Sequence, residues 1–353
     1  MNRPLHGGNL NWAATIAGCP VSALTDFSAS INPLGTPQSA IAAIVDSTNR
    51  LKAYPDPNYP QLRSHLAQHH QIEPEFILPG NGSAELLTWA GRELAQQKFT
   101  YLVVPAFGDY FRALNTFNAN IIPCPLNLQL PKSLSLPVAP SPHPESGLLL
   151  NNPHNPTGRL WTRSEILPYL DEFDLVVIDE AFMDFLTPDR EASLISLVKQ
   201  YPNLVILRSL TKFYALPGLR IGYAIAHPER LKRWQKWRDP WSVNALAAAA
   251  TIAAIQDKEF QQQTWNWLEK ARSQLYARLS NISGLEPLKG TANYLLVKTK
   301  SSATRLQEQL LIRDRIVIRD CISFPELGDR YFRIAVRLPA ENDRLVEAIM
   351  KIL

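Results

Sequence analysis

Short apolar runs that alternate with helical stretches constrain the fold of this chain more than any other feature. The runs lie near residues 101, 147, 175, 203 and 221. Such unbroken runs are typical of buried strands, and strands that alternate with helices form mainly parallel sheets with helices on both faces. The pattern predicts an α/β fold whose large domain is built on a doubly wound, mainly parallel sheet.

The pattern changes after His227. Helical stretches, short strands and a closing helix follow one another at Ala245–Ile255, Phe260–Leu279, Tyr294–Val297, Ile316–Ile318, Tyr331–Val336 and Glu341–Ile352. This order predicts a smaller α+β domain. We expect an N-terminal arm over residues 1–40, a large domain over 41–238 and a small domain over 239–353. Residues 123–146 are proline-rich and predict a connecting loop with a short strand.

Composition narrows the classes of function. The net charge is +4 and the basic residues are spread along the chain, which argues against nucleic acid as a partner but allows an anionic small substrate. The three cysteines, Cys19, Cys124 and Cys321, lack the spacing of metal ligands. We expect a reduced compartment and no metal site. The N-terminus has no apolar segment typical of a signal peptide, and no apolar run approaches the length of a membrane span, so we expect a cytoplasmic protein.

Lys212 lies just past the end of the apolar run near residue 203, in the stretch RSLTKFYALPGLRIGY. A lysine in such a buried, cation-rich place loses its proton readily, and a free amine forms a Schiff base with an aldehyde. Ser209, Thr211 and Arg220 beside it supply two hydroxyls and a guanidinium, which suit a phosphate dianion. An aldehyde that bears a phosphate is pyridoxal 5′-phosphate (PLP). Taken alone, the stretch fits a surface lysine equally well.

Two other stretches add to a possible PLP site. In GNGSAE, Gly82 and Ser83 begin an amphipathic helix whose free N–H groups would bind a phosphate, although an ordinary capped helix has the same pattern. In PAFGDY, Phe107 and Tyr110 follow a buried strand, at the end where open α/β sheets bind ligands. An aromatic ring there would stack on a pyridine ring, or would be one more core residue.

Asp179 ends the apolar run near residue 175 and has no charge partner in its own strand. Burying a carboxylate without a partner is costly, so we expect a cation beside it. The protonated nitrogen of a pyridine ring is such a cation.

The N-terminal arm and three arginines are candidates for substrate contacts. The arm presents His6 and Asn32 and is either poorly ordered or folded over an active site. Arg319, Arg333 and Arg337 lie on or beside strands of the small domain and are either solvated or bound to carboxylate and phosphate groups. Because strand side chains alternate, we expect Arg333 and Arg337 to project to the same face.

Taken together, GNGSAE, PAF, NNPHNPTG, VVIDEAF and SLTKFYALPGLRIGY resemble the motifs of fold-type I PLP enzymes in the class I/II aminotransferase superfamily. The resemblance covers residues 26–340. HGGN, SINPLG, PWSVN, RDCISFP and FRIAVR are similar to the branch that contains histidinol-phosphate aminotransferases and threonine-phosphate decarboxylases. The resemblance implies a PLP-dependent transferase-like fold.

The resemblance also implies a role for each matching residue. Lys212 would hold PLP as a Schiff base, Asp179 would pair with the ring nitrogen, Phe107 would stack on the ring and Asn155 would bind the phenolic oxygen. The phosphate of PLP would be bound by Gly82, Ser83, Ser209, Thr211 and Arg220. Tyr54 would reach that phosphate from a second subunit, which makes the expected enzyme an obligate homodimer.

For the substrate, the resemblance implies that Arg333 binds a carboxylate. His6, Asn32, Arg319 and Arg337 are candidates for the surroundings of a substrate phosphate. One position departs from the pattern of many aminotransferases, because Phe182 stands where they have a tyrosine that contacts the ring oxygen.

Three functions are compatible with these residues. The first is decarboxylation of L-threonine O-3-phosphate to (R)-1-aminopropan-2-yl phosphate in cobalamin biosynthesis, and the sequence motifs and Phe182 favour it. The second is transamination of histidinol phosphate or a related amino acid on the same scaffold. The third is a PLP-binding regulator, which the sequence disfavours because no DNA-binding domain fits before residue 40.

Overall fold

The computed structural model describes residues 3–128, 136–138 and 143–353. Of the proline-rich region predicted as a loop and short strand, residues 129–135 and 139–142 lie outside the described residues. The described ends of that region include strand β4 (Ile121–Pro125) and the start of strand β5 (Ser146–Asn151).

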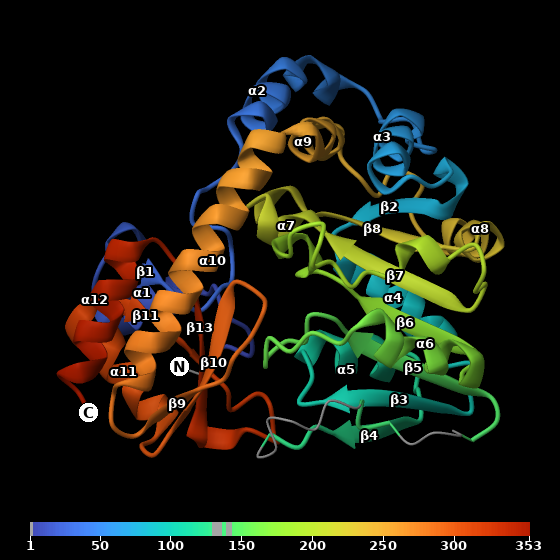
Figure 1. The fold of residues 1–353 in the computed structure, drawn as a ribbon. Helices are drawn as coiled ribbons and strands as arrows, with labels where there is room; N and C mark the ends of the chain where they lie inside the picture. The colour runs from blue at the N-terminus through green and yellow to red at the C-terminus, as the bar shows by residue number, and fades with distance from the viewer. Residues whose placement is uncertain (1–2, 129–135, 139–142) are drawn as a thin grey trace.

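A mixed sheet forms the centre of the large domain (Figure 1). Across the described residues it has seven strands in the order β2 (Ile77–Asn81), β8 (Ile221–Ala226), β7 (Leu204–Ser209), β6 (Leu175–Asp179), β5, β3 (Phe99–Val104) and β4. Strand β8 pairs antiparallel with both neighbours, whereas β7, β6, β5, β3 and β4 pair in parallel. This confirms the predicted mainly parallel sheet.

Helices cover both faces of this sheet, as a doubly wound fold requires. One face packs against α4 (Ser83–Leu94), α5 (Gly108–Asn115) and α8 (Pro228–Trp237). The other packs against helices that include α6 (Arg163–Glu172). Alternate residues of one strand point to the two faces. In β6, Val177 packs on the face covered by α4, α5 and α8, and Val176 packs on the face covered by α6. Both faces are therefore apolar, which explains the unbroken apolar runs in the sequence.

A smaller antiparallel sheet lies beside the large one (Figure 1). Its strands, in order, are β12 (Arg319–Asp320), β13 (Tyr331–Ala335), β10 (Tyr294–Thr299) and β9 (Leu285–Pro287). The helices associated with it are α10 (Lys258–Ser280), α11 (Ala303–Asp314) and α12 (Pro339–Met350). Of the predicted strand at 316–318, only β11 (Ile316–Val317) forms, and β12 follows one residue later. Strand β13 ends one residue earlier than predicted.

The N-terminal arm is joined to the small sheet region. Strand β1 (Thr25–Asp26) pairs in parallel with β11, and helix α1 (Leu10–Ala17) packs against α11. Helix α9 (Ala245–Gln256) packs instead against α2 (Gln38–Asp46) and α3 (Pro60–His70), away from the small sheet. The domain limits at residues 40 and 238 stay predictions, and α9 belongs spatially with α2 and α3.

A buried network of charges lies directly behind the edge of the sheet where β6 and β7 end. Arg208 is 1% exposed and makes ion pairs with Glu180 at 3.1 Å, Asp184 at 2.7 Å and Glu191 at 2.7 Å. Arg208 immediately precedes Ser209, and Glu180 immediately follows Asp179. The network therefore holds the backbone on which two predicted site residues lie.

Removing the cation of this network should destabilise the fold strongly. Arg208→Met leaves buried carboxylates without their partner, and we expect the free energy of unfolding to fall by about 3–5 kcal/mol. Lys199→Met is the matched control, because the Lys199–Glu73 pair is exposed and worth at most about 1 kcal/mol. Urea unfolding measures both, and equal losses would show that the network is not what holds β6 and β7 together.

Candidate active site

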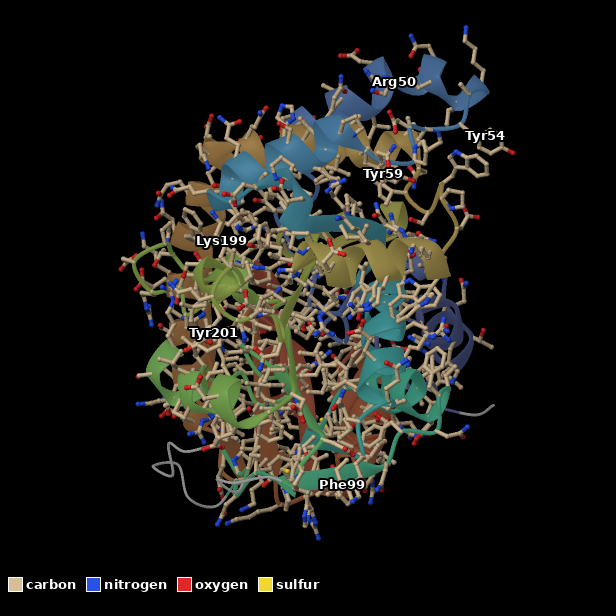
Figure 2. The ribbon with its side chains drawn as sticks, turned by 90° about the vertical axis from the view of Figure 1, so that its right-hand side faces the viewer. Arg50, Tyr54, Tyr59, Phe99, Lys199 and Tyr201 are labelled. Carbon is tan, nitrogen blue, oxygen red and sulfur yellow. The ribbon has the colours of Figure 1, made fainter. Side chains whose placement is uncertain are left out.

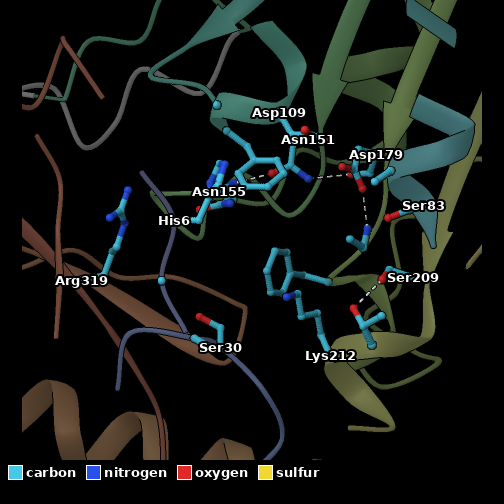
Figure 3. A pocket seen from close by; sticks show the side chains of 18 of the residues that line it. His6, Ser30, Ser83, Asp109, Asn151, Asn155, Asp179, Ser209, Lys212 and Arg319 are labelled. Atoms are coloured by element: carbon cyan, nitrogen blue, oxygen red, sulfur yellow. Dashed lines mark hydrogen bonds between the residues drawn. The ribbon is translucent and has the colours of Figure 1, made fainter. Parts of the chain in front are cut away.

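A cavity of about 320 Å³ lies where three parts of the chain meet (Figure 3). The ends of the large sheet, the small sheet and the N-terminal arm all contribute to its walls. Of the residues predicted for the site, those that line the cavity are His6, Ser83, Phe107, Asn155, Asp179, Ser209, Thr211, Lys212, Arg220, Arg319 and Arg333.

Lys212 lies on the single-turn helix α7 (Leu210–Phe213), which follows β7 without a loop. Its amine is buried, and burial, with Arg333 and Arg220 nearby, lowers the pKa of Lys212 to about 8. Asp179 opposes this shift by favouring the ammonium. At neutral pH a larger fraction of this amine is therefore unprotonated than in an ordinary lysine, which is what attack on an aldehyde requires.

Asp179 is the last residue of β6 and its carboxylate is buried beside the cavity. Oδ2 accepts a hydrogen bond from the hydroxyl of Tyr110 at 2.8 Å, and Oδ1 accepts one from the backbone N–H of Ala181 at 2.9 Å. Burial raises the pKa of Asp179, and the Tyr110 hydrogen bond lowers it. Within the described residues Asp179 makes no ion pair, so the carboxylate suits a cationic ligand group such as a pyridinium nitrogen.

Groups suited to a phosphate converge at the start of α4. Gly82 has a φ of +76°, and a Cβ added there would lie 2.7 Å from Nη2 of Arg220. Glycine thus lets the guanidinium approach the helix N-terminus, where backbone N–H groups lack helical partners. The hydroxyls of Ser209 and Thr211 lie 2.8 Å apart. This donor set fits the phosphate of PLP.

Arg333 and Asn155 form the opposite wall. The Arg333 guanidinium donates to Oδ1 of Asn155 and, at 3.2 Å, to the carbonyl of Ser28. Its Nε is buried and has no hydrogen-bond partner among the described residues. Because Arg333 occupies the amide oxygen of Asn155, the amide NH₂ is left to donate to a ligand. Arg333 itself retains an N–H for an anion such as a carboxylate.

The N-terminal arm is folded against the cavity. Of the two alternatives from the sequence, a poorly ordered arm or an arm folded over the site, the structure has the second. Arg319 donates to the carbonyl of Pro4 at 3.0 Å and also to the carbonyl of Leu5 and the hydroxyl of Ser323. The ring of His6 lies 5.4 Å from that of Phe107, and burial together with Arg319 lowers the pKa of His6. His6 of the arm and Arg319 of β12 therefore both line the cavity (Figure 3).

Asn32 and Arg337 do not line the cavity. The amide of Asn32 donates to the carbonyl of Phe213 at 2.8 Å and to the hydroxyl of Thr264, so this residue supports the lysine segment. Arg337 donates to Glu341 at 2.7 Å and to the carbonyl of Asp26. Because β13 ends at Ala335, strand alternation does not extend to Arg337, and the argument that placed it beside Arg333 does not hold.

Tyr54 also lies outside the cavity. Its side chain is 79% exposed and packs only against the ring of Trp241 among the aromatic side chains described, at 4.6 Å (Figure 2). Ser30 was not predicted from the sequence. Its buried hydroxyl lines the cavity and has no partner within the described residues. No role was predicted for the hydroxyl of Tyr110 either. No local pattern distinguishes either group, because the functional position of each depends on distant segments.

The family model for class I and II aminotransferases matches residues 22–349. The chain belongs to this family. The predicted superfamily and fold type are thereby confirmed, and so is PLP as the cofactor, with which the lysine, carboxylate and phosphate-binding groups agree. Among the described residues, no cluster of His, Cys, Asp and Glu is arranged to hold a metal ion.

The chain is similar to enzymes of two reaction classes within the family. It is 38% identical over 354 residues to a threonine-phosphate decarboxylase of Salmonella typhimurium, covering 99% of this chain and 96% of that protein. It is 31% identical to histidinol-phosphate aminotransferase 1 of Mannheimia succiniciproducens, covering 94% and 91%. The crystal structure of L-threonine-O-3-phosphate decarboxylase from Porphyromonas gingivalis matches with a TM-score of 0.82 at 25% identity, covering 92% and 98%.

The lowered pKa of Lys212 leads to a test of its role. We expect the apoprotein to capture PLP faster as the pH rises through about 8, because the reactive amine is the unprotonated form. Lys212→Ala should abolish the borohydride-reducible link, whereas the exposed Lys232→Ala should retain it. Absorbance after stopped-flow mixing measures the capture rate, and a reducible link in Lys212→Ala would contradict the assignment.

Proposed function

We propose that this enzyme decarboxylates L-threonine O-3-phosphate to (R)-1-aminopropan-2-yl phosphate, a step of cobalamin biosynthesis. The observation that supports this most directly is a pair of guanidinium groups, Arg333 and Arg319, in one cavity. One amino acid that bears both a carboxylate and a phosphate would occupy both of them. The similarity to threonine-phosphate decarboxylases points to the same substrate.

In this proposal, Asp179 pairs with the ring nitrogen of PLP, Lys212 holds the cofactor, and Arg220 with the start of α4 holds its phosphate. Bound PLP supplies an electron sink for whichever bond at the substrate Cα stands perpendicular to its ring. Arg333 would bind the substrate carboxylate, and Arg319 with His6 would bind the substrate phosphate. With both ends of the substrate fixed, its orientation about Cα is set by the protein, and this orientation selects the bond that breaks.

Lys212 also supplies the proton that decarboxylation requires. Decarboxylation replaces the carboxylate on Cα with a proton, and the amine of Lys212, once released from the cofactor, would be the group that donates it.

Transamination of histidinol phosphate is the second candidate, because aminotransferases of that kind are also similar to this chain. Phe182 argues for decarboxylation. Its ring packs edge-on against Tyr294 with centroids 4.9 Å apart and offers no hydroxyl where many aminotransferases have a tyrosine. Asn155 is then the side chain available to hold the phenolic oxygen of PLP.

We further propose that a second copy of the chain completes the site with its Tyr54. In one copy Tyr54 faces outward (Figure 2). The apolar side chains of Ile41, Val45 and Leu51, from the preceding part of the chain, are also exposed. Tyr54 also lines a surface hollow, together with residues of η2 (Thr48–Lys52), the start of α3 and α9. Such a patch suits an interface between subunits.

A cytoplasmic location remains a prediction; none of the helices described is long and apolar enough to span a membrane.

Two assays run side by side on the PLP-loaded enzyme test the reaction. We expect CO₂ release from threonine phosphate with no requirement for a 2-oxo acid, and little transfer of an amino group from histidinol phosphate to 2-oxoglutarate. The reverse result, with amine transfer and no CO₂ release, would contradict the proposed decarboxylase and favour the aminotransferase.

The two arginines of the small domain provide a matched pair of variants. We expect Arg333→Gln to raise KM for threonine phosphate about ten- to a hundredfold, the effect of losing a charge-assisted contact worth roughly 1.5–3 kcal/mol. Arg337→Gln should leave KM nearly unchanged, because that guanidinium is paired with Glu341 outside the cavity. Steady-state kinetics separates the two, and an equal rise in both variants would place Arg337 in the substrate site.

A further inference from the structure

We propose that Tyr110 is a positioning residue that keeps the carboxylate of Asp179 ionised and fixed in orientation toward the ring nitrogen of PLP. The proposal rests on the role of Asp179 given above and extends it to a side chain that also lines the cavity and that would act on the ring nitrogen through Asp179. The hydrogen bond from the Tyr110 hydroxyl to Asp179 is the observation from which it starts.

The two oxygens of Asp179 are held from different segments of the chain. Tyr110 lies in the first turn of α5, is 2% exposed and donates to Oδ2 at 2.8 Å. The N–H of Ala181, two residues past Asp179, donates to Oδ1 at 2.9 Å. Because each oxygen has one fixed donor, the carboxylate cannot rotate freely, and each oxygen keeps a further lone pair for a ligand.

The charged and titratable groups around Asp179 make this hydrogen bond important. Burial favours the neutral acid and raises the pKa of Asp179; the Tyr110 bond opposes burial, as does Lys212 on α7. Asp109 on α5 adds to the rise, and Tyr294 on β10 also faces the carboxylate. Burial raises the pKa of Tyr110 well above its usual value, so its hydroxyl remains a donor throughout the range in which Asp179 titrates.

Packing alone is the competing explanation for Tyr110. Its ring lies edge-on to Phe107 with centroids 5.7 Å apart and belongs to the core between α5 and the sheet. Tyr110→Phe keeps the ring and removes only the hydroxyl. The variant therefore separates the hydrogen bond from the packing.

The experiment measures the Kd of the apoprotein for PLP across a range of pH. We expect Tyr110→Phe to weaken binding about ten- to a hundredfold at neutral pH, the usual effect of losing a hydrogen bond to a charged group. PLP binding requires ionised Asp179 and is lost as the pH falls through its pKa. Because the variant raises that pKa, binding should be lost at a higher pH than in the wild type.

Tyr223→Phe is the matched control. The hydroxyl of Tyr223 is equally buried and bonds to Nε2 of His70 at 2.7 Å, but Tyr223 does not line the cavity. This control should bind PLP with the wild-type Kd and pH dependence. An unchanged Kd and pH limit in Tyr110→Phe would overturn the proposal, as would equal weakening in the control.

A double-variant cycle tests whether Tyr110 acts through Asp179. If it does, Tyr110→Phe should change the Kd little in an Asp179→Asn background, whereas full additivity would overturn the proposal. If Asp179→Asn alone leaves PLP binding and turnover unchanged, the role of Asp179 fails and this proposal with it. If only Asp179→Asn has an effect, the proposed function stands and this proposal fails.

A second variant provides a test that does not depend on the stability of Tyr110→Phe. Placing 3-fluorotyrosine at position 110 keeps the hydroxyl and makes it a stronger donor. The pH limit of PLP binding should then move below that of the wild type. No shift, or a shift in the other direction, would overturn the proposal.

Discussion

The site depends on one geometric constraint, which is that neighbouring parallel strands end at the same edge of the sheet. Asn151 of β5 pairs in register with Asp179 of β6, and Asp179 pairs with Leu207 of β7. Lys212 follows Ser209 at the end of β7 by only three residues. Asn151 and Asp179, and likewise Asp179 and Leu207, are 28 positions apart in the chain and are thereby held side by side by the pairing of neighbouring strands.

Electrostatics determines what this edge can bind. The cavity walls contain Lys212, Arg220, Arg319 and Arg333, against the carboxylates of Asp109 and Asp179. Gathering cations in a buried space is unfavourable unless anions join them, so the phosphate of PLP and the anionic groups of a substrate are part of the balance of charge. The same surplus of positive charge lowers the pKa of Lys212 and so favours its reactive form. Cofactor binding and lysine reactivity therefore have a common cause.

The small domain and the arm bring the groups proposed to bind substrate to that edge. Pairing between β1 and β11 attaches the arm to the small domain, and Arg319 fastens its first residues through their carbonyl groups. Asn32 connects the arm to the backbone at Phe213 and to Thr264 on α10. A residue expected to bind substrate thus serves to tie three segments together. Its side chain has no spare donor for a ligand, because both of its amide hydrogens are already used.

The amino-acid sequence by itself determined the sheet, the family and most residues of the candidate cofactor site, because these depend on local patterns. A few neighbouring residues suffice to recognise each of three features: an apolar strand that ends in Asp179, a lysine just after another strand, and a glycine before a helix. Only the tertiary structure decided how side chains from distant segments combine. Arg337 pairs with Glu341 because β13 ends before it. Arg208 pairs with carboxylates that follow β6. Tyr110, on α5, donates a hydrogen bond to Asp179. Packing between elements determines such pairings, and the spacing of residues along the chain does not predict them.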